Sequence, residues 1–197
     1  MIGAIVLAAG LSRRMGQQKL VLPWGDTTVI GQVVRTLIQA EIKEIIVVTG
    51  GAHSQLENAL KEYPLQLIFN PRYEEDQMIL SLQVGLAVLS GRVEAALLAL
   101  GDQPQIELET VQAVLAGYRE SQGGLVVPSF RMRRGHPIVI GRPYWSSLMT
   151  LQPPATLREF LNLHSNEIHY INVERDTILQ DLDTPEDYQR ETKNRLP

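Results

Sequence analysis

The residues best suited to chemistry lie near the start of the chain, in the segment Gly10–Lys19. This segment holds two glycines, one serine and three cations, directly after the apolar run Ile2–Leu7. Backbone N–H groups in such a loop bind anionic oxygens, and glycine lets the chain approach them without a Cβ. Arg13, Arg14 and Lys19 add positive charge where a triphosphate would lie. The segment therefore predicts a phosphate-binding loop, although its spacing matches neither GxGxxG nor GxxxxGK[ST].

A carboxylate in a second segment is suited to binding a metal ion. Asp102 follows the apolar run Ala95–Leu100, which is expected to be a buried strand. Ligands of open α/β sheets bind beyond the carboxyl ends of the strands, which places Asp102 beside the phosphate loop. Mg²⁺ prefers such hard oxygen ligands and bridges to phosphates. Capping is a poor explanation for Asp102, because the next helix is expected to start near Glu107.

The segment Asp181–Asp187, with the sequence DLDTPED, holds more carboxylates. Asp181 and Asp183 point to the same side of an extended segment. Thr184 or Asp183 is also a suitable N-cap for a terminal helix that has Pro185 at its first position. A metal site and a helix cap both remain open interpretations of this segment.

A histidine motif, Gly135-His136-Pro137, ends the basic segment 131–135 (RMRRG), which is expected to be a loop. The chemistry of His136 gives it no unique role, because a base, a phosphate ligand and a structural residue are all compatible with it.

Length and composition set the framework for these residues. The chain has 197 residues, with 44% apolar and 20% charged, so we expect one α/β domain over residues 1–197. A net charge of −4 argues against nucleic-acid binding. The chain has no cysteine for disulfides or thiolate metal sites, no secretory leader pattern, and no apolar run near the roughly 20 residues of a membrane span. We therefore expect a cytoplasmic protein with no nucleic-acid or membrane partner.

The positioning elements are short apolar runs that alternate with helical patterns. Strands are expected at 2–7, 45–49, 65–69, 95–100, 125–127, 137–140 and 168–173. Helices are expected at 28–40, 54–63, 77–89, 107–120, 155–163 and from Pro185. This alternation predicts an α/β fold with a mostly parallel central sheet and helices on both faces.

The stretch Leu7-Ala8-Ala9-Gly10-Leu11-Ser12-Arg13-Arg14-Met15-Gly16, followed by Lys19, resembles the signature of the nucleotidyltransferases. It is most similar to the branch that contains molybdenum cofactor cytidylyltransferase and guanylyltransferase. The resemblance implies a Rossmann-like three-layer nucleotidyltransferase fold. It extends through the Asp-x-Pro motif at Asp102, the Gly-His-Pro motif at Gly135 and the DxDTPED segment.

The resemblance also implies roles for individual residues. The expected nucleotide-binding residues are Leu7, Ala8, Ala9, Gly10, Ser12, Arg13, Arg14, Lys19, Ser81 and Asp102. Arg14, Lys19 and Asp102 are the expected catalytic residues, and Asp102 and Asp183 the expected Mg²⁺ ligands. Gly135, His136, Pro137 and Asp181 are candidates for binding the acceptor. The chain departs from the family pattern at 76–81, where Asp76 replaces a glycine and Leu80 a serine.

The expected function is transfer of CMP from CTP to the phosphate of the molybdenum–pterin cofactor, with release of pyrophosphate. Ala8-Ala9-Gly10 favours CTP, because guanylyl relatives carry Gly-Gly at this place. Alternatives are GTP as donor, a sugar or polyol phosphate as acceptor, or a non-catalytic nucleotide- and cofactor-binding chaperone. A molybdoenzyme or another cofactor-handling protein is a candidate partner.

Overall fold

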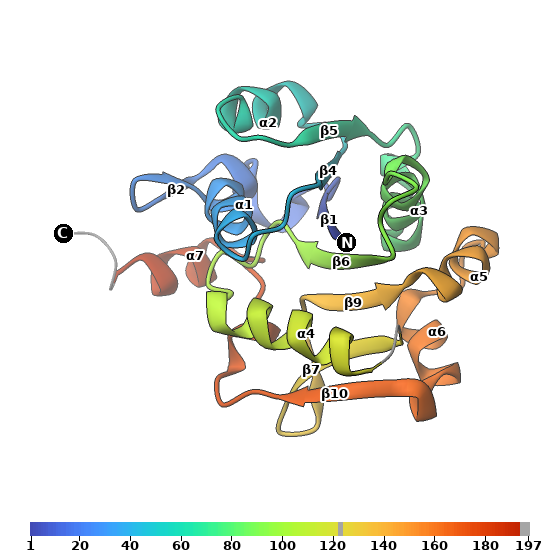
Figure 1. Ribbon diagram of the computed structural model, residues 1–197. Helices are drawn as coiled ribbons and strands as arrows, with labels where there is room; N and C mark the ends of the chain where they lie inside the picture. The colour runs from blue at the N-terminus through green and yellow to red at the C-terminus, as the bar shows by residue number, and fades with distance from the viewer. Residues whose placement is uncertain (122–123, 194–197) are drawn as a thin grey trace.

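Strands and helices alternate along the chain, and eight strands form one sheet (Figure 1). The computed structural model describes residues 1–121 and 124–193. The strands of this sheet are β1 (Ile2–Ala8), β4 (Ile45–Thr49), β5 (Gln66–Phe69), β6 (Ala95–Leu100), β7 (Leu125–Phe130), β8 (Arg133–Arg134), β9 (Ile138–Gly141) and β10 (Ile168–Asn172). A separate hairpin consists of β2 (Pro23–Trp24) and β3 (Thr27–Thr28).

Helices lie between most of these strands. They are α1 (Val29–Gln39), α2 (His53–Leu60), α3 (Met78–Val88), α4 (Leu108–Glu120), α5 (Trp145–Thr150), α6 (Leu157–Leu163) and α7 (Pro185–Thr192). Short 3-10 turns lie at Arg13–Met15, Lys19–Val21, Tyr73–Glu75, Arg142–Tyr144, Ser165–Glu167 and Asp176–Leu179. The expected elements are all present with ends shifted by a few residues, whereas helix α5 and the short strands β2, β3 and β8 were not expected. None of the helices in the described part is long and apolar enough to span a bilayer.

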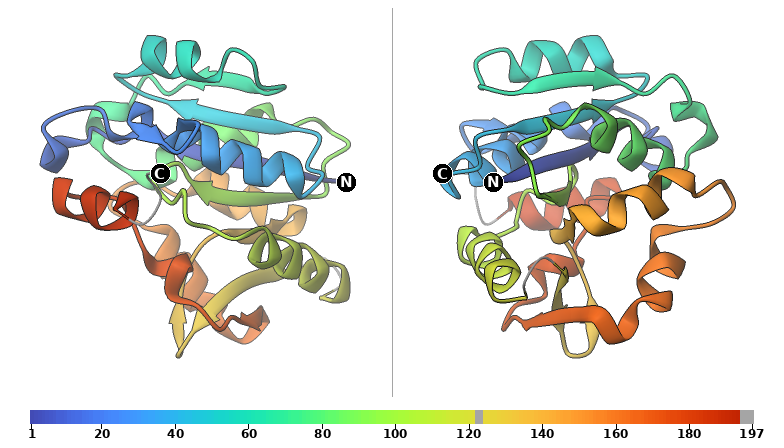
Figure 2. Two further views of the ribbon diagram at one scale, coloured as in Figure 1. Left: turned by 90° about the vertical axis from the view of Figure 1, so that its left-hand side faces the viewer. Right: turned by 45° about the vertical axis from the view of Figure 1, so that its right-hand side comes forward.

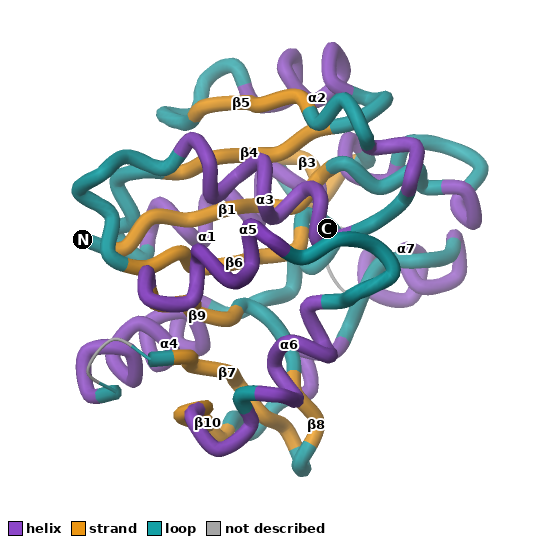
Figure 3. The backbone as a smooth tube through the Cα atoms, turned by 90° about the vertical axis from the view of Figure 1, so that its right-hand side faces the viewer, coloured by secondary structure: helices purple, strands orange, loops and turns teal. Residues whose placement is uncertain are grey.

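The sheet is mostly parallel, as the sequence predicts. Its strand order is β10-β7-β9-β6-β1-β4-β5, with β8 paired to β7 (Figure 3). Strand β9 runs antiparallel to β6 and β7, whereas β1, β4, β5 and β6 are parallel neighbours, as are β7 and β10. Strand β9 is antiparallel to β7 because the chain turns back after β7 and enters β9 without a crossover helix.

That connection corrects the expectation of a basic loop at 131–135. Arg133 pairs with Phe130 and Arg134 with Ser129, so the segment forms a β-hairpin with β7. Arg131 and Met132 form its turn with φ of 49° and 67°. Two central residues with positive φ are typical of a tight hairpin turn, although the sequence lacks the usual Asn-Gly or Asp-Gly.

Helices cover both faces of the sheet (Figure 2), and an apolar core lies on each face. One core joins β1 and β6 to α1, α2 and α4, and the other joins them to α3, α5 and α6. Strand β6 contributes to both cores, which explains why its sequence is a continuous apolar run. The molecule therefore has the three-layer arrangement that the sequence predicts.

The register of β1 and β6 brings two candidate segments together. Leu7 is level with Leu100, and the N–H of Gly101 donates to the carbonyl of Leu7 at 2.9 Å. The phosphate loop and the Asp102 segment therefore leave the sheet side by side.

Candidate functional site

A cleft of about 540 Å³ opens at the carboxyl ends of β1 and β6. Its size is within the usual range for a small-molecule site. All ten residues expected to bind the nucleotide line it, and so do Asp181 and Asp183: the full lining is Leu7 to Arg14, Lys19, Leu20, Tyr73, Asp76, Gln77, Met78, Ser81, Leu100, Asp102, Asp181 and Asp183. The structure thus collects residues from the start, middle and end of the sequence at one edge of the sheet.

The loop after β1 has an unusual backbone. Ser12 lies in the left-handed region with φ of 48°, and Gly16 follows with φ of 65°. A non-glycine residue is strained in this region and keeps the conformation only where surrounding contacts hold it. The Oγ of Ser12 donates to Oε1 of Gln18 at 3.0 Å, and that oxygen also accepts from the N–H of Leu20 at 3.4 Å. Gln18 therefore ties the loop to the turn that carries Lys19, a role that its sequence position did not reveal.

The centre of the site is the ammonium of Lys19. Its Nζ donates to Oδ2 of Asp102 at 2.6 Å and to Oδ1 of Asp183 at 3.2 Å. The Lys19 side chain is only 11% exposed, against 22% for Asp102 and 32% for Asp183. Three residues that are far apart in the sequence therefore form one charged cluster.

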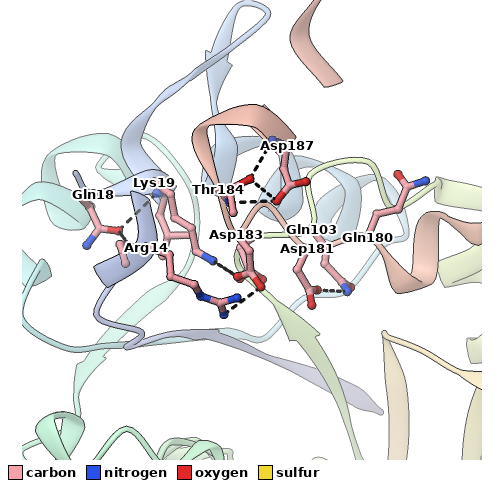
Figure 4. Close-up of polar contacts among 12 residues, drawn as sticks. Arg14, Gln18, Lys19, Gln103, Gln180, Asp181, Asp183, Thr184 and Asp187 are labelled. Atoms are coloured by element: carbon pink, nitrogen blue, oxygen red, sulfur yellow. Dashed lines mark hydrogen bonds and ion pairs between the residues drawn. The ribbon is translucent and has the colours of Figure 1, made fainter. Parts of the chain in front are cut away.

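Electrostatics keep Lys19 charged within this cluster. Burial lowers the pKa of the Lys19 ammonium, but the charges and hydrogen bonds of Asp102 and Asp183 outweigh burial and raise it above 10.5. Arg14 adds a second cation, since its Nη2 lies 3.0 Å from Oδ2 of Asp183 (Figure 4). Arg14 is 71% exposed, so this pair contributes little to stability.

Asp181 sits beside this cluster with a different partner. Its Oδ1 accepts a hydrogen bond from Nε2 of Gln103 at 2.7 Å (Figure 4). Burial, followed by the charge of Asp102, raises the pKa of the Asp181 carboxyl. The N–H of Leu182 donates to the carbonyl of Asp102 at 3.1 Å. This bond joins the segment after β6 to the segment before α7 and holds both in register.

Helix capping at α7 does not involve Asp183. Thr184 is the N-cap, and its Oγ accepts from the N–H of Asp187 at 3.2 Å. The Asp187 carboxylate in turn accepts from the N–H and hydroxyl of Thr184, which completes a capping box. Capping and the cleft therefore use different residues of one segment, and Asp183 is left to face Lys19.

The carboxylates of Asp102 and Asp183 could supply some of the ligands of a divalent ion. Asp102 and Asp183 present hard oxygens to one shared point, now marked by the Lys19 Nζ. In the described ranges 1–121 and 124–193, no three His, Cys, Asp or Glu side chains are close enough to hold a metal by themselves. A Mg²⁺ ion here would need oxygens from phosphate or water, which is its usual preference.

The expected acceptor residues Gly135, His136 and Pro137 lie outside the lining of this cleft. The His136 N–H donates to the carbonyl of Ile178 at 3.2 Å, and a Cβ on Gly135 would lie 2.3 Å from that oxygen. Close approach therefore requires glycine at 135. The His136 Nε2 is buried without a hydrogen-bond partner in the described residues, and burial lowers the pKa of His136 to about 4. The motif packs against the segment that leads to Asp181.

The opposite wall of the cleft comes from the segment between β5 and α3. The buried Nδ2 of Asn70 donates to Oγ of Ser81 at 3.0 Å. Tyr73, Asp76, Gln77 and Met78 line this wall, and the sequence indicated only that 76–81 departs from the family pattern. Asp76 has a φ of 53°, the left-handed conformation for which glycine is usual.

Comparison with known families gives one match over most of the chain. Residues 4–168 match the model of the MobA-like NTP transferase domain. Among curated proteins, the molybdenum cofactor cytidylyltransferase of Escherichia coli K12 is 29% identical over 95% of this chain and 93% of its own length. The nicotine blue oxidoreductase of Paenarthrobacter nicotinovorans is 26% identical over 96% and 95%.

Solved structures show the same fold. The crystal structure of Rv0371c from Mycobacterium tuberculosis H37Rv superposes with a TM-score of 0.84 at 28% identity, covering 98% of both chains. A second structure of Rv0371c is a complex with manganese, with a TM-score of 0.79 over 96% of both chains at 28% identity.

Proposed function

The chain belongs to the MobA-like NTP transferase family, and on this premise we propose that it transfers CMP from CTP to the phosphate of the molybdenum–pterin cofactor. Nucleotidyl transfer is the activity of the family, whereas the donor and the acceptor are our proposal. The molybdenum cofactor cytidylyltransferase of E. coli, similar to this chain along nearly all of its length, supports both. Ala8-Ala9-Gly10 adds support for CTP, because guanylyl relatives carry Gly-Gly at that place.

The observation that carries the proposal is the placement of Lys19, at the end of the loop after β1, between Asp102 and Asp183. A protein that only binds a nucleotide needs cations for the phosphates. A transferase also needs carboxylates for the metal that neutralises the leaving pyrophosphate. The cluster contains both sets of groups.

The proposed reaction is an in-line displacement at the α-phosphorus of CTP. An oxygen of the acceptor phosphate forms a bond to that phosphorus. The bond to the bridging oxygen breaks, and its electron pair leaves with pyrophosphate. The acceptor is already a phosphate dianion, so no residue has to remove a proton. The reaction therefore depends on positioning and on stabilisation of charge.

The backbone groups and the charged side chains of the cleft act on different parts of the substrate. Backbone groups from Ala9 to Ser12 orient the triphosphate, and Arg14 and Lys19 bind its oxygens. Lys19 contributes most at the α-phosphate, where negative charge increases. Asp102 and Asp183 would hold Mg²⁺, which would supply further positive charge at the phosphates.

On the acceptor side, we keep Asp181 as a binding residue because it lines the cleft. We assign Gly135, His136 and Pro137 an indirect role, since they support the 176–181 segment from outside the cleft. We further propose that residues 1–197 act as one domain, because the cleft uses residues from Leu7 to Asp183.

The test is a pyrophosphate-release assay with purified protein and Mg²⁺. CTP, GTP, UTP and ATP are compared as donors, each with molybdenum-loaded pterin and then with sugar and polyol phosphates. We expect release with CTP and the pterin acceptor. Release only with a different pair would correct the substrates, whereas nucleotide binding without release under any combination would favour a non-catalytic binder.

A further inference from the structure

We propose that the Lys19 ammonium holds the place of a divalent cation between Asp102 and Asp183. The cleft would then admit metal and nucleoside triphosphate together, as one chelate, and bind the free metal poorly. This inference rests on the proposed function and adds to it the form in which the donor enters.

The Lys19 ammonium and a metal ion would compete for the same carboxylate oxygens. The Lys19 Nζ lies 2.6 Å from Oδ2 of Asp102 and 3.2 Å from Oδ1 of Asp183. A metal ion that contacts both carboxylates must take these oxygens from the ammonium. The two cations also repel each other, so they cannot share the point between the carboxylates.

A metal ion at this point would deprive the Lys19 ammonium of its two acceptors. Lys19 is 9% exposed as a residue, and Asp102 and Asp183 are the acceptors of its ammonium. A buried charge that loses its partners is strongly unfavourable. Free metal therefore binds against the cost of leaving Lys19 buried and unpaired.

A bound triphosphate would give the displaced Lys19 ammonium new acceptors. Its oxygens accept from Lys19 when the carboxylates turn to the metal, so each charge keeps a partner. Arg14 also leaves Asp183 in this exchange, but it is 71% exposed and water solvates it at little cost. Lys19, and not Arg14, is therefore the residue that couples metal to nucleotide, and linkage makes this coupling reciprocal.

The experiment is titration of the protein with Mn²⁺ and no nucleotide, following free Mn²⁺ by electron paramagnetic resonance. Lys19→Met removes the competing charge. Lys19→Gln also removes it but keeps an amide donor for the carboxylates, in case the Met variant does not fold. Lys19→Arg keeps the charge, and Lys61→Met removes a surface lysine that is 69% exposed. Circular dichroism checks that each variant is folded.

We expect Mn²⁺ alone to bind Lys19→Met or Lys19→Gln at least about tenfold more tightly than the unaltered protein, within the usual range for coupled sites. Lys19→Arg and Lys61→Met should bind Mn²⁺ as weakly as the unaltered protein. Equal Mn²⁺ affinity in the unaltered protein and a folded, uncharged Lys19 variant would overturn the inference. Failure of the proposed function is a separate result: no pyrophosphate is released with any donor and acceptor, whatever the Mn²⁺ titration gives.

Discussion

Two polar clusters meet at the cleft, and they differ in how their atoms are partnered. In the charged cluster, Lys19 and Arg14 are paired with Asp102 and Asp183. In the neighbouring neutral cluster, Gln103 Oε1, Gln105 Oε1, His136 Nε2 and Thr177 Oγ1 are buried and have no hydrogen-bond partner in the described residues. The clusters touch where Gln103 donates to Asp181.

This difference separates two tasks. The charged cluster has paired groups that exchange partners when a charged ligand enters, so it suits binding and chemistry. In the neutral cluster, Gly135 and His136 pack against Ile178. This contact holds the segment that leads to Asp181 and Asp183 in place. Substitutions in the first should therefore change turnover, and substitutions in the second should change stability.

The largest effect is expected from Asp102→Ala. We expect kcat to fall about a thousandfold, the scale for losing one preorganised electrostatic group, which is about 4 kcal/mol. Asp26→Ala is the matched control, because Asp26 pairs with Arg35 at an exposed position outside the cleft. Steady-state pyrophosphate release checks both variants, and near-normal kcat in Asp102→Ala would remove this residue from the chemistry.

A smaller effect is expected from Arg14→Ala. Loss of its phosphate contact should lower kcat/KM by about 10- to 100-fold, as one charge-assisted hydrogen bond is worth about 1.5–3 kcal/mol. Arg13→Ala is the comparison, because Arg13 also lines the cleft but forms no ion pair with a described carboxylate. If Arg13→Ala costs more than Arg14→Ala, the roles of the two arginines are reversed.

His136, in the neutral cluster, should make the free energy of unfolding depend on pH. The His136 pKa is about 4 in the fold and about 6.5 when unfolded, so the unfolded state binds the proton more readily between these values. This contribution is fully present above pH 6.5 and is lost as pH falls towards 4. We expect a loss of about 2 kcal/mol at pH 5 relative to pH 7.

Urea denaturation at pH 7 and pH 5 measures this loss. In His136→Leu, which has no titrating ring, the difference between the two pH values should shrink by about the same 2 kcal/mol. An unchanged difference would show that His136 is accessible to protons in the fold.

The smallest effect is expected from Thr184→Ala. Loss of an N-cap costs about 1 kcal/mol of unfolding free energy. Turnover should stay nearly constant, because Thr184 caps α7 and it is the neighbouring Asp183, not Thr184, that contacts Lys19. Thr184→Ser, which keeps the cap oxygen, is the control. Thermal unfolding and the pyrophosphate assay together check the result, and a large loss of turnover would mean that the cap also positions Asp183.

Sequence patterns predicted the framework of the molecule well. Buried strands such as Ala95–Leu100 read as continuous apolar runs because both faces of the sheet are covered. The antiparallel return through Arg131–Arg134 was missed, because its turn residues, Arg131 and Met132, are not typical of positive φ. Helix α5 was missed because it is short, only Trp145–Thr150.

The site was predictable to the level of its segments. The rule for carboxyl ends of parallel strands brought Gly10–Lys19 and Asp102 to one edge. The direct contact of Lys19 with both Asp102 and Asp183 was not predictable, since it depends on a fold that joins residues 164 positions apart. The placement of His136 outside the cleft also required the structure, because a motif shows proximity in sequence and says nothing of the direction of a ring.

The central claim is that the charged cluster transfers a nucleotidyl group, and the most direct measurement follows the α-phosphate itself. CTP labelled at the α-phosphate is incubated with the protein, Mg²⁺ and molybdenum-loaded pterin, and the label is located by chromatography and mass spectrometry. We predict that the label moves to the acceptor with one pyrophosphate released per transfer, and that Asp102→Ala slows both about a thousandfold. Label that stays in CTP with every phosphorylated acceptor would contradict the account.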